Sequence, residues 1–192
     1  MYDAVSDSYC YPGTTVLKNR ANLRTQSDLD FFEEEATAQR FTEPLPAGKF
    51  DVGHLRAIHR HLFQDVYTWA GAPRTVWISK GGNPFCHPDN INRELERLFA
   101  DLARQKNLSG LDAKAFAEKA AHFLADLNAI HPFREGNGRT QLAFMTALAE
   151  QAGHRFALER IDPNAMLDAT IESFGGSEKP LATLIRGLIE QA

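Results

Sequence analysis

A short loop between two long helical patterns is the feature that most constrains this chain. Apolar residues recur at helical spacing over residues 113–130 and again over residues 140–152. The loop between them reads His131-Pro132-Phe133-Arg134-Glu135-Gly136-Asn137-Gly138-Arg139. A glycine-rich turn at the start of a helix presents backbone N–H groups and the positive end of the helix dipole. The sequence therefore predicts an anion-binding site where this loop enters the second helix.

The charged side chains of the loop indicate that the anion is a nucleotide polyphosphate. Arg139 offers a planar guanidinium group that suits phosphate oxygens. Glu135 would repel a bare anion, so we expect a hard cation such as Mg²⁺ between its carboxylate and the phosphates. His131 is the candidate general base, because the ordinary histidine pKa of about 6.5 leaves neutral imidazole available at cellular pH.

The other residues of the loop are expected to shape it. Gly136 and Gly138 permit backbone angles and a close approach that a side chain would block. Asn137 either holds the loop or donates to a phosphate oxygen. Phe133 is expected to anchor the loop in the core, and Arg134 receives no role.

Composition excludes several classes of partner. The chain has 192 residues, which predicts one domain with a real core. Its net charge of −4 gives no reason to expect nucleic acid or an anionic membrane as the main partner. Cys10 and Cys86 lie far apart without metal-ligand spacing, which is typical of free thiols in a reducing compartment. Asp3 and Asp7 stand where a signal peptide would be apolar, so we expect a cytoplasmic protein.

Helical periodicity dominates the chain, so the predicted fold class is all-α, a helical bundle with one short β-hairpin. Residues 1–26 lack periodic apolar positions and are expected to form an N-terminal arm, followed by one domain over residues 27–192. Ser27 and Asp51 are the predicted N-caps of the first two helices. Further helices are expected over residues 89–106, 113–130, 140–152, 165–174 and 180–189.

One segment has strand character. Residues 75–79 are rich in β-branched and aromatic side chains, and the turn sequence Gly81-Gly82-Asn83-Pro84 follows. The sequence predicts a hairpin here. An exposed strand edge can hold an extended segment of a target protein by strand addition. The alternative is that the hairpin only covers a core face.

Three histidines of the second predicted helix are a weaker candidate for a site. His54 and His61 share a helix face, and His59 lies between them. No carboxylate or cysteine completes a metal site, so we favour packing and surface roles over metal binding.

Two longer stretches resemble one known family. Residues 131–139, His-Pro-Phe-x-Glu-Gly-Asn-Gly-Arg, resemble the signature of Fic (filamentation induced by cAMP) domains, which mostly transfer AMP from ATP to a hydroxyl of a target protein. Residues 58–71 resemble the upstream Fic pattern of a helix leading to Asp-Val-Tyr-x-Trp-Ala-Gly. Residues 16–19 resemble a short stretch near the start of bacterial Fic toxins and effectors. The resemblance implies a Fic-type helical bundle whose hairpin is a flap beside the active site.

The resemblance also implies roles for individual residues. It makes His131 the catalytic base and Glu135 the ligand of a Mg²⁺ cofactor, with ATP as co-substrate. The residues implied for nucleotide binding are Gly136, Asn137, Gly138, Arg139 and Lys80. The residues implied for the target-docking flap are Val76, Trp77, Ile78 and Ser79.

Partners follow from the same resemblance. Targets of bacterial Fic toxins include the ATPase subunits of DNA gyrase and topoisomerase IV. Many Fic domains are blocked by a helix carrying Ser/Thr-x-x-x-Glu-Gly/Asn, and the 192 residues contain no such pattern. The resemblance then points to a small separate antitoxin that supplies the inhibitory glutamate. No direct contact with nucleic acid or a membrane is expected.

One position departs from the Fic pattern. The family has a second arginine, which reaches the terminal phosphates of ATP, where this chain has Leu142. We therefore expect an attenuated protein adenylyltransferase. A degenerate Fic fold that binds nucleotide or protein without turnover stays open, and Leu142 is its support. A Doc-like protein kinase stays open as well, although Doc-like motifs carry bulkier residues and a lysine in place of Gly136 and Gly138.

Overall fold

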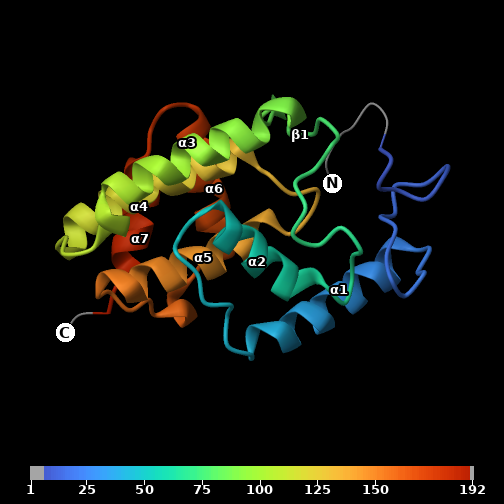
Figure 1. The fold of residues 1–192 in the computed structure, drawn as a ribbon, viewed down its shortest axis with the longest axis horizontal. Coiled ribbons are helices and arrows are strands. Elements are labelled where there is room, and N and C mark those ends of the chain that lie inside the picture. The colour runs from blue at the N-terminus through green and yellow to red at the C-terminus, as the bar shows by residue number, and fades with distance from the viewer. Residues whose placement is uncertain (1–6, 191–192) are drawn as a thin grey trace. The chain divides into compact units, whose positions relative to one another are not determined.

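Helices and one two-stranded hairpin make up the regular structure of residues 7–190, the part of the chain that the computed structural model describes (Figure 1). The predicted all-α class with a short hairpin is confirmed. The helices are α1 (Gln26–Phe41), α2 (Val52–Phe63), α3 (Ile91–Arg104), α4 (Ala113–Ile130), α5 (Asn137–Ala152), α6 (Pro163–Phe174) and α7 (Lys179–Leu188), and the strands are β1 (Ser79–Lys80) and β2 (Asn83–Pro84).

The chain divides into two units. Of the described residues, the first unit comprises 7–92 and 131–140, and the second comprises 93–130 and 141–190. Helix α5 begins in the first unit and continues into the second. The division into an arm over residues 1–26 and one domain after it stays a prediction.

The first unit contains α1, α2, the hairpin and the loop at residues 131–139. Helices α1 and α2 lie side by side (Figure 1). Thr25 caps α1, and its hydroxyl accepts from the backbone N–H three residues on at 3.3 Å, so the predicted cap at Ser27 is wrong by two residues. Asp51 caps α2 as predicted, and accepts from the N–H three residues on at 2.8 Å.

The hairpin begins later than the sequence predicts. Its strands pair antiparallel across the glycines at residues 81–82, whose φ angles of 58° and 80° suit a tight two-residue turn. Residues 75–78, for which the sequence predicts strand, precede β1. The Val76 carbonyl accepts from Arg74, and the Trp77 indole N–H donates to the Phe85 carbonyl at 2.9 Å. These side chains take backbone groups that a longer ladder would need.

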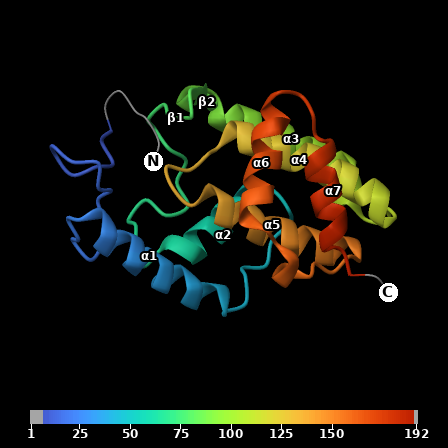
Figure 2. The ribbon, with the colours of Figure 1, turned by 180° about the vertical axis from the view of Figure 1, so that it is seen from behind.

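The second unit is built on α4 (Figure 2). Helix α4 packs against α6 and α7, which also pack against each other. Phe99 of α3 lies edge-on to Phe123 of α4 and Phe144 of α5, with ring centroids 5.4 and 5.5 Å apart. Asp112 and Asp162 accept from first-turn N–H groups of α4 and α6, which are the caps that their sequence positions favour.

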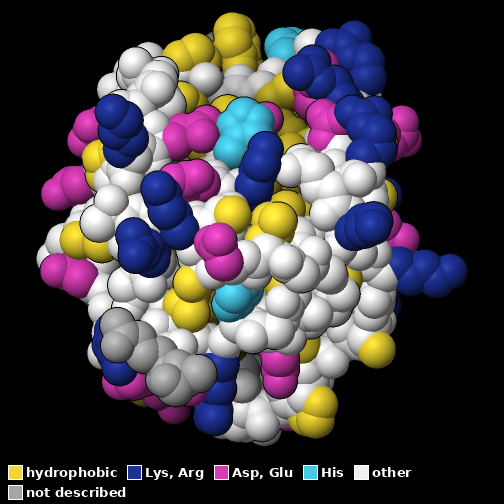
Figure 3. Space-filling view, turned by 90° about the vertical axis from the view of Figure 1, so that its left-hand side faces the viewer, with side chains coloured by type: hydrophobic (Ala, Val, Ile, Leu, Met, Phe, Trp, Pro, Cys, Tyr) yellow, Lys and Arg dark blue, Asp and Glu magenta, His cyan; other side chains and the backbone are white. Residues whose placement is uncertain are grey.

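Charges of both signs are interspersed over the face that Figure 3 shows. This mixture agrees with the small net charge of −4. Within residues 7–190, no helix combines the length and the apolar character that crossing a bilayer requires.

Candidate active site

His131 adopts a backbone conformation that few residues tolerate. It directly follows α4, and its φ of 48° lies in the left-handed region, where histidine is more frequent than most other non-glycine residues. The residue is buried, and its ring stacks on Phe85 with centroids 3.9 Å apart and planes at 18°. Phe85 follows β2, so the hairpin contributes one wall around the candidate base.

Asn137 holds the loop through its own side chain. Its Oδ1 accepts from the Phe133 N–H at 2.9 Å, and its Nδ2 donates to the Phe133 carbonyl at 2.8 Å. Both residues are buried, in keeping with the anchoring role expected of Phe133. The side chain of Asn137 therefore supports the loop, and nucleotide binding by this residue stays a prediction.

The two glycines of the loop meet different surroundings. Gly136 has a φ of 78°, and a Cβ there would lie 2.2 Å from the ring of Phe63, so only glycine fits. A Cβ at Gly138 would meet nothing within 4 Å. Because α5 begins at Asn137, the N–H groups of its first turn have no intrahelical partner and lie at this open end.

Arg139 is held by α1, a contact that the sequence did not reveal. One of its Nη atoms pairs with the carboxylate of Glu33, and the other donates to the Thr37 hydroxyl at 3.3 Å. The guanidinium carbon lies 4.7 Å from the centroid of the Phe63 ring. The Tyr67 hydroxyl donates to the second oxygen of Glu33, and burial together with Glu33 raises the pKa of Tyr67, which keeps the donor protonated.

A helix-face argument could have found this contact. One face of α1 carries three buried residues at successive spacings of four positions: Leu29, Glu33 and Thr37. An acid on a core-facing stripe calls for a cationic partner. Its neighbours Glu34 and Glu35 are exposed, so the three consecutive glutamates do not share one environment.

Glu135 lies beside this arginine with a side chain that is 31% exposed. One carboxylate oxygen accepts from the Gly136 N–H at 2.9 Å and lies 3.9 Å from an Nη of Arg139. Burial raises the pKa of Glu135, and the charge of Glu33 adds to this, while the Gly136 N–H and Arg139 act in the opposite direction. Mg²⁺ is usually bound by one or two carboxylates together with substrate phosphates, so this donor set fits it.

No group of three or more His, Cys, Asp or Glu side chains within residues 7–190 forms an all-protein metal cage. The histidines of α2 bind backbone atoms instead. The Nε2 of His54 bonds with the Pro46 carbonyl at 2.9 Å, and the Nε2 of His61 bonds with the Arg40 carbonyl at 3.0 Å. These contacts use ring nitrogens that metal ligation would need.

His59 is a buried support of the loop. Its Nδ1 accepts from the Gly71 N–H at 2.8 Å, so Nε2 carries the proton that is donated to the Glu135 carbonyl at 3.0 Å. Its ring stacks between Phe133, at 3.8 Å, and Phe63, at 4.8 Å. Burial lowers the pKa of His59 to about 4, and the charge of Arg139 acts in the same direction. The imidazole is therefore neutral in the folded protein.

Stability should fall with pH below neutrality because of His59. The unfolded chain binds a proton near the ordinary pKa of about 6.5, whereas the folded protein does so only near 4. The contribution of His59 to the free energy of unfolding is therefore fully present above the unfolded-state pKa of about 6.5. It is lost as the pH falls from there to the folded-state pKa of about 4. We expect a loss of about 2 kcal/mol between about pH 7 and pH 5, measured by urea unfolding. In His59→Gln, which keeps a donor and an acceptor but cannot titrate, this part of the decrease should be absent; an equal decrease would contradict the assignment.

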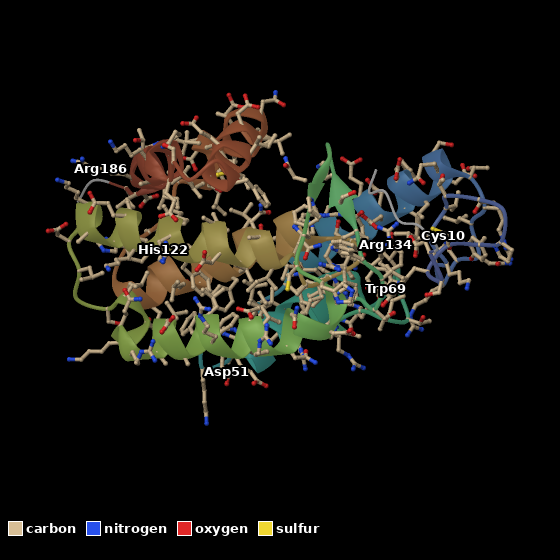
Figure 4. All side chains as sticks on the ribbon, turned by 90° about the horizontal axis from the view of Figure 1, so that it is seen from above. Cys10, Asp51, Trp69, His122, Arg134 and Arg186 are labelled. Atoms are coloured by element: carbon tan, nitrogen blue, oxygen red, sulfur yellow. The ribbon has the colours of Figure 1, made fainter. Side chains whose placement is uncertain are left out.

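Arg134, for which the sequence indicated no role, joins the N-terminal arm to the loop. Two of its guanidinium nitrogens donate to one Asp7 oxygen at 2.8 and 2.6 Å, and both residues are largely buried. Burial opposes the charge of Asp7, but the Arg134 guanidinium holds the pKa of its carboxyl below the ordinary value. The Cys10 thiol donates to the same carboxylate. The labels of Cys10 and Arg134 accordingly lie near each other in Figure 4.

The predicted flap residues lie along the hairpin. Ile78 is buried, Trp77 is 54% exposed, and Val76 and Ser79 are half-buried. Lys80 is exposed at the end of β1. Target docking by this segment and nucleotide binding by Lys80 stay predictions.

Comparison with known proteins places the chain in a family. Residues 49–149 match the family model described as Fic/DOC family. A probable protein adenylyltransferase of Sinorhizobium fredii is 52% identical over 189 residues, which cover 98% of each chain. The probable protein adenylyltransferase Fic of Escherichia coli is 36% identical over 97% of this chain and 94% of its own. The crystal structure of BepC protein of Bartonella tribocorum with bound AMPPNP matches with a TM-score of 0.86 and 30% identity, over 96% of this chain and 97% of that one. The chain belongs to the Fic/DOC family.

Proposed function

We propose that this chain is a protein adenylyltransferase that moves AMP from ATP to a Ser, Thr or Tyr hydroxyl of a target protein. The observation that carries the proposal is the loop at residues 131–139, where a buried histidine precedes an open helix N-terminus with Arg139 in its first turn. The names of the relatives from S. fredii and E. coli support it, as does the AMPPNP in the BepC structure.

His131 is the proposed base. Its imidazole accepts the proton of the target hydroxyl while the hydroxyl oxygen attacks the α-phosphorus of ATP. The new O–P bond forms as the bond between the α-phosphorus and the oxygen that bridges to the β-phosphate breaks. Pyrophosphate leaves with that electron pair. Positioning and electrostatics supply most of the catalysis in phosphoryl-type transfers.

The phosphates are proposed to lie at the start of α5. The N–H groups of Gly138 and Arg139, with the guanidinium group, would face their oxygens. Glu135 would hold Mg²⁺, which neutralises phosphate charge when it is bound. Because Glu33 and Thr37 already fix the guanidinium of Arg139, its charge is in place before ATP arrives.

The target and the regulator are proposed from the family resemblance. The targets are the ATPase subunits of DNA gyrase and topoisomerase IV in the cytoplasm, and the regulator is a small antitoxin that supplies a glutamate. The 192 residues contain no Ser/Thr-x-x-x-Glu-Gly/Asn pattern, so these residues supply no inhibitory glutamate of that kind. Leu142 is proposed to lower the activity.

Incubation with ATP, Mg²⁺ and the ATPase subunit of DNA gyrase should add one adenylyl group to that subunit, detected by mass spectrometry of the intact protein. A reaction without ATP and one with His131→Asn serve as controls. A phosphoryl shift would indicate the Doc-like kinase reaction, against which Gly136 and Gly138 argue. No shift on this subunit, on its topoisomerase IV counterpart or on proteins of a bacterial lysate would favour a Fic fold that binds without turnover.

A further inference from the structure

We propose that Arg74 is a positioning residue that fixes the backbone of His131 and both ends of the hairpin in one arrangement. Arg74 does not touch the reacting atoms; it acts through the groups that it holds. The expected effect of Arg74 on AMP transfer rests on the proposed function. Its expected effect on the opening of the hairpin and the loop does not.

The side chain of Arg74 reaches three carbonyl oxygens from separate parts of the first unit. Its Nη1 donates to Val76 before β1 at 2.7 Å, and its Nη2 donates to Cys86 after β2 at 2.6 Å. Its Nε donates to the His131 carbonyl at 2.9 Å. The Arg74 backbone N–H adds a bond to the Pro132 carbonyl at 2.8 Å. One residue thus joins the hairpin to the loop that carries the base.

Burial makes these bonds consequential. Arg74 is 2% exposed, and a guanidinium group taken out of water is costly unless its N–H groups find acceptors. The rigid fork of arginine can donate in three directions in one plane, and the single ammonium of lysine cannot reproduce that geometry. Binding the three carbonyl oxygens therefore requires both the charge and the planar shape of the Arg74 guanidinium.

The backbone of His131 needs such support. A non-glycine residue with a φ of 48° persists only where the surrounding structure over-determines it. Arg74 bonds the carbonyls of His131 and Pro132, which fixes the peptide groups on the C-terminal side of the base. Phe85, which stacks on the imidazole, belongs to the same hairpin that Arg74 holds at Val76 and Cys86. The position of the base relative to the hairpin is therefore set through Arg74.

The first test is Arg74→Lys, with Arg60→Lys on the exposed face of α2 as the matched control. Transfer is measured as AMP label incorporated from α-³²P-labelled ATP into proteins of a bacterial lysate at several ATP concentrations. Because a misplacement of about 1 Å can cost up to about a hundredfold in rate, we expect Arg74→Lys to lower kcat about tenfold with KM for ATP unchanged. AMPPNP binding should also be unchanged, and Arg60→Lys should behave as wild type.

A loss in kcat without a change in KM for ATP distinguishes a positioning role of Arg74 from a general structural role. An unchanged kcat in a folded Arg74→Lys protein overturns the positioning role. A parallel loss of AMPPNP affinity also overturns it, because Arg74 would then be a general support of the fold or of the nucleotide site. If the wild-type chain labels no protein, the proposed function fails, and the next measurement still tests Arg74.

Native-state hydrogen exchange on the wild-type chain needs no variant to fold. The Phe85 N–H, bonded to the Ile78 carbonyl at 3.2 Å, reports opening of the hairpin, and the Arg74 N–H reports opening of the loop. If Arg74 couples the two, both amides should exchange with the same opening free energy and the same denaturant dependence. A hairpin amide that exchanges much faster than the Arg74 amide would show that the hairpin moves independently, and would overturn the proposal.

Discussion

Replacing His131 should lower AMP transfer by about a hundredfold or more while AMPPNP binding persists. The imidazole acts on the target hydroxyl, whereas the nucleotide contacts are proposed at the start of α5. General base catalysis contributes about 10²- to 10⁴-fold, so we expect a loss in that range in kcat. Transfer is measured by label incorporation, and binding is measured by calorimetry with AMPPNP.

The backbone at this position dictates which substitution is informative. His131→Ala places alanine at a φ of 48°, which adds backbone strain to the loss of the base. Asparagine tolerates the left-handed region and cannot serve as the base, so His131→Asn separates the two effects. His122→Asn on the exposed part of α4 is the matched control. A kcat of His131→Asn close to that of the wild type would mean that another residue is the base.

The loop and the helices were predictable because their signals are local. Helical periodicity, the caps at Asp51 and Asp162 and the glycines of the loop depend on residues within a few positions of one another. The sequence predicts the cap of α1 two residues late, at Ser27, because Thr25 and Ser27 are both good caps and only the backbone conformation distinguishes them.

The partners of buried charges could not be predicted in the same way. Glu33 pairs with Arg139 across 106 positions, and Arg74 donates to the His131 carbonyl across 57. Nothing within a few residues of either charge indicates such a partner, since the pairing depends on which segments the fold brings together. Burial of the charge on a core-facing stripe is the one local hint, and it is present for Glu33.

The hairpin shows how side chains can override a strand signal. Residues 75–79 have the composition of a strand, yet the ladder contains only Ser79, Lys80, Asn83 and Pro84. The Val76 carbonyl is taken by Arg74 and the Phe85 carbonyl by the indole of Trp77. Where a side chain takes the backbone acceptor, strand propensity alone does not extend the sheet.

The contacts of Arg139 with α1 explain why we expect the residue at position 142 to be important for ATP binding. The guanidinium of Arg139 is shared with Glu33 and Thr37, and Glu135 lies nearby, so the acidic side chains partly offset its charge toward ATP. A second arginine would add charge where Leu142 supplies none. Leu142 lies three residues after Arg139 on α5, on a neighbouring face of the same helix, and it is half-buried, unlike Met145 and Ala149.

Leu142→Arg should therefore raise transfer and tighten ATP binding. A charged hydrogen bond to phosphate contributes about 1.5–3 kcal/mol, which corresponds to about tenfold to a hundredfold in affinity or rate. Leu142→Met, which keeps an apolar side chain of similar size, is the control and should match wild type. Calorimetry with AMPPNP and label incorporation give the two values, and growth of bacteria that express the variant should slow in proportion. If Leu142→Arg leaves both values unchanged or lowers both, the terminal phosphates do not lie beside this position, and a different nucleotide or binding without turnover becomes the better explanation of the site.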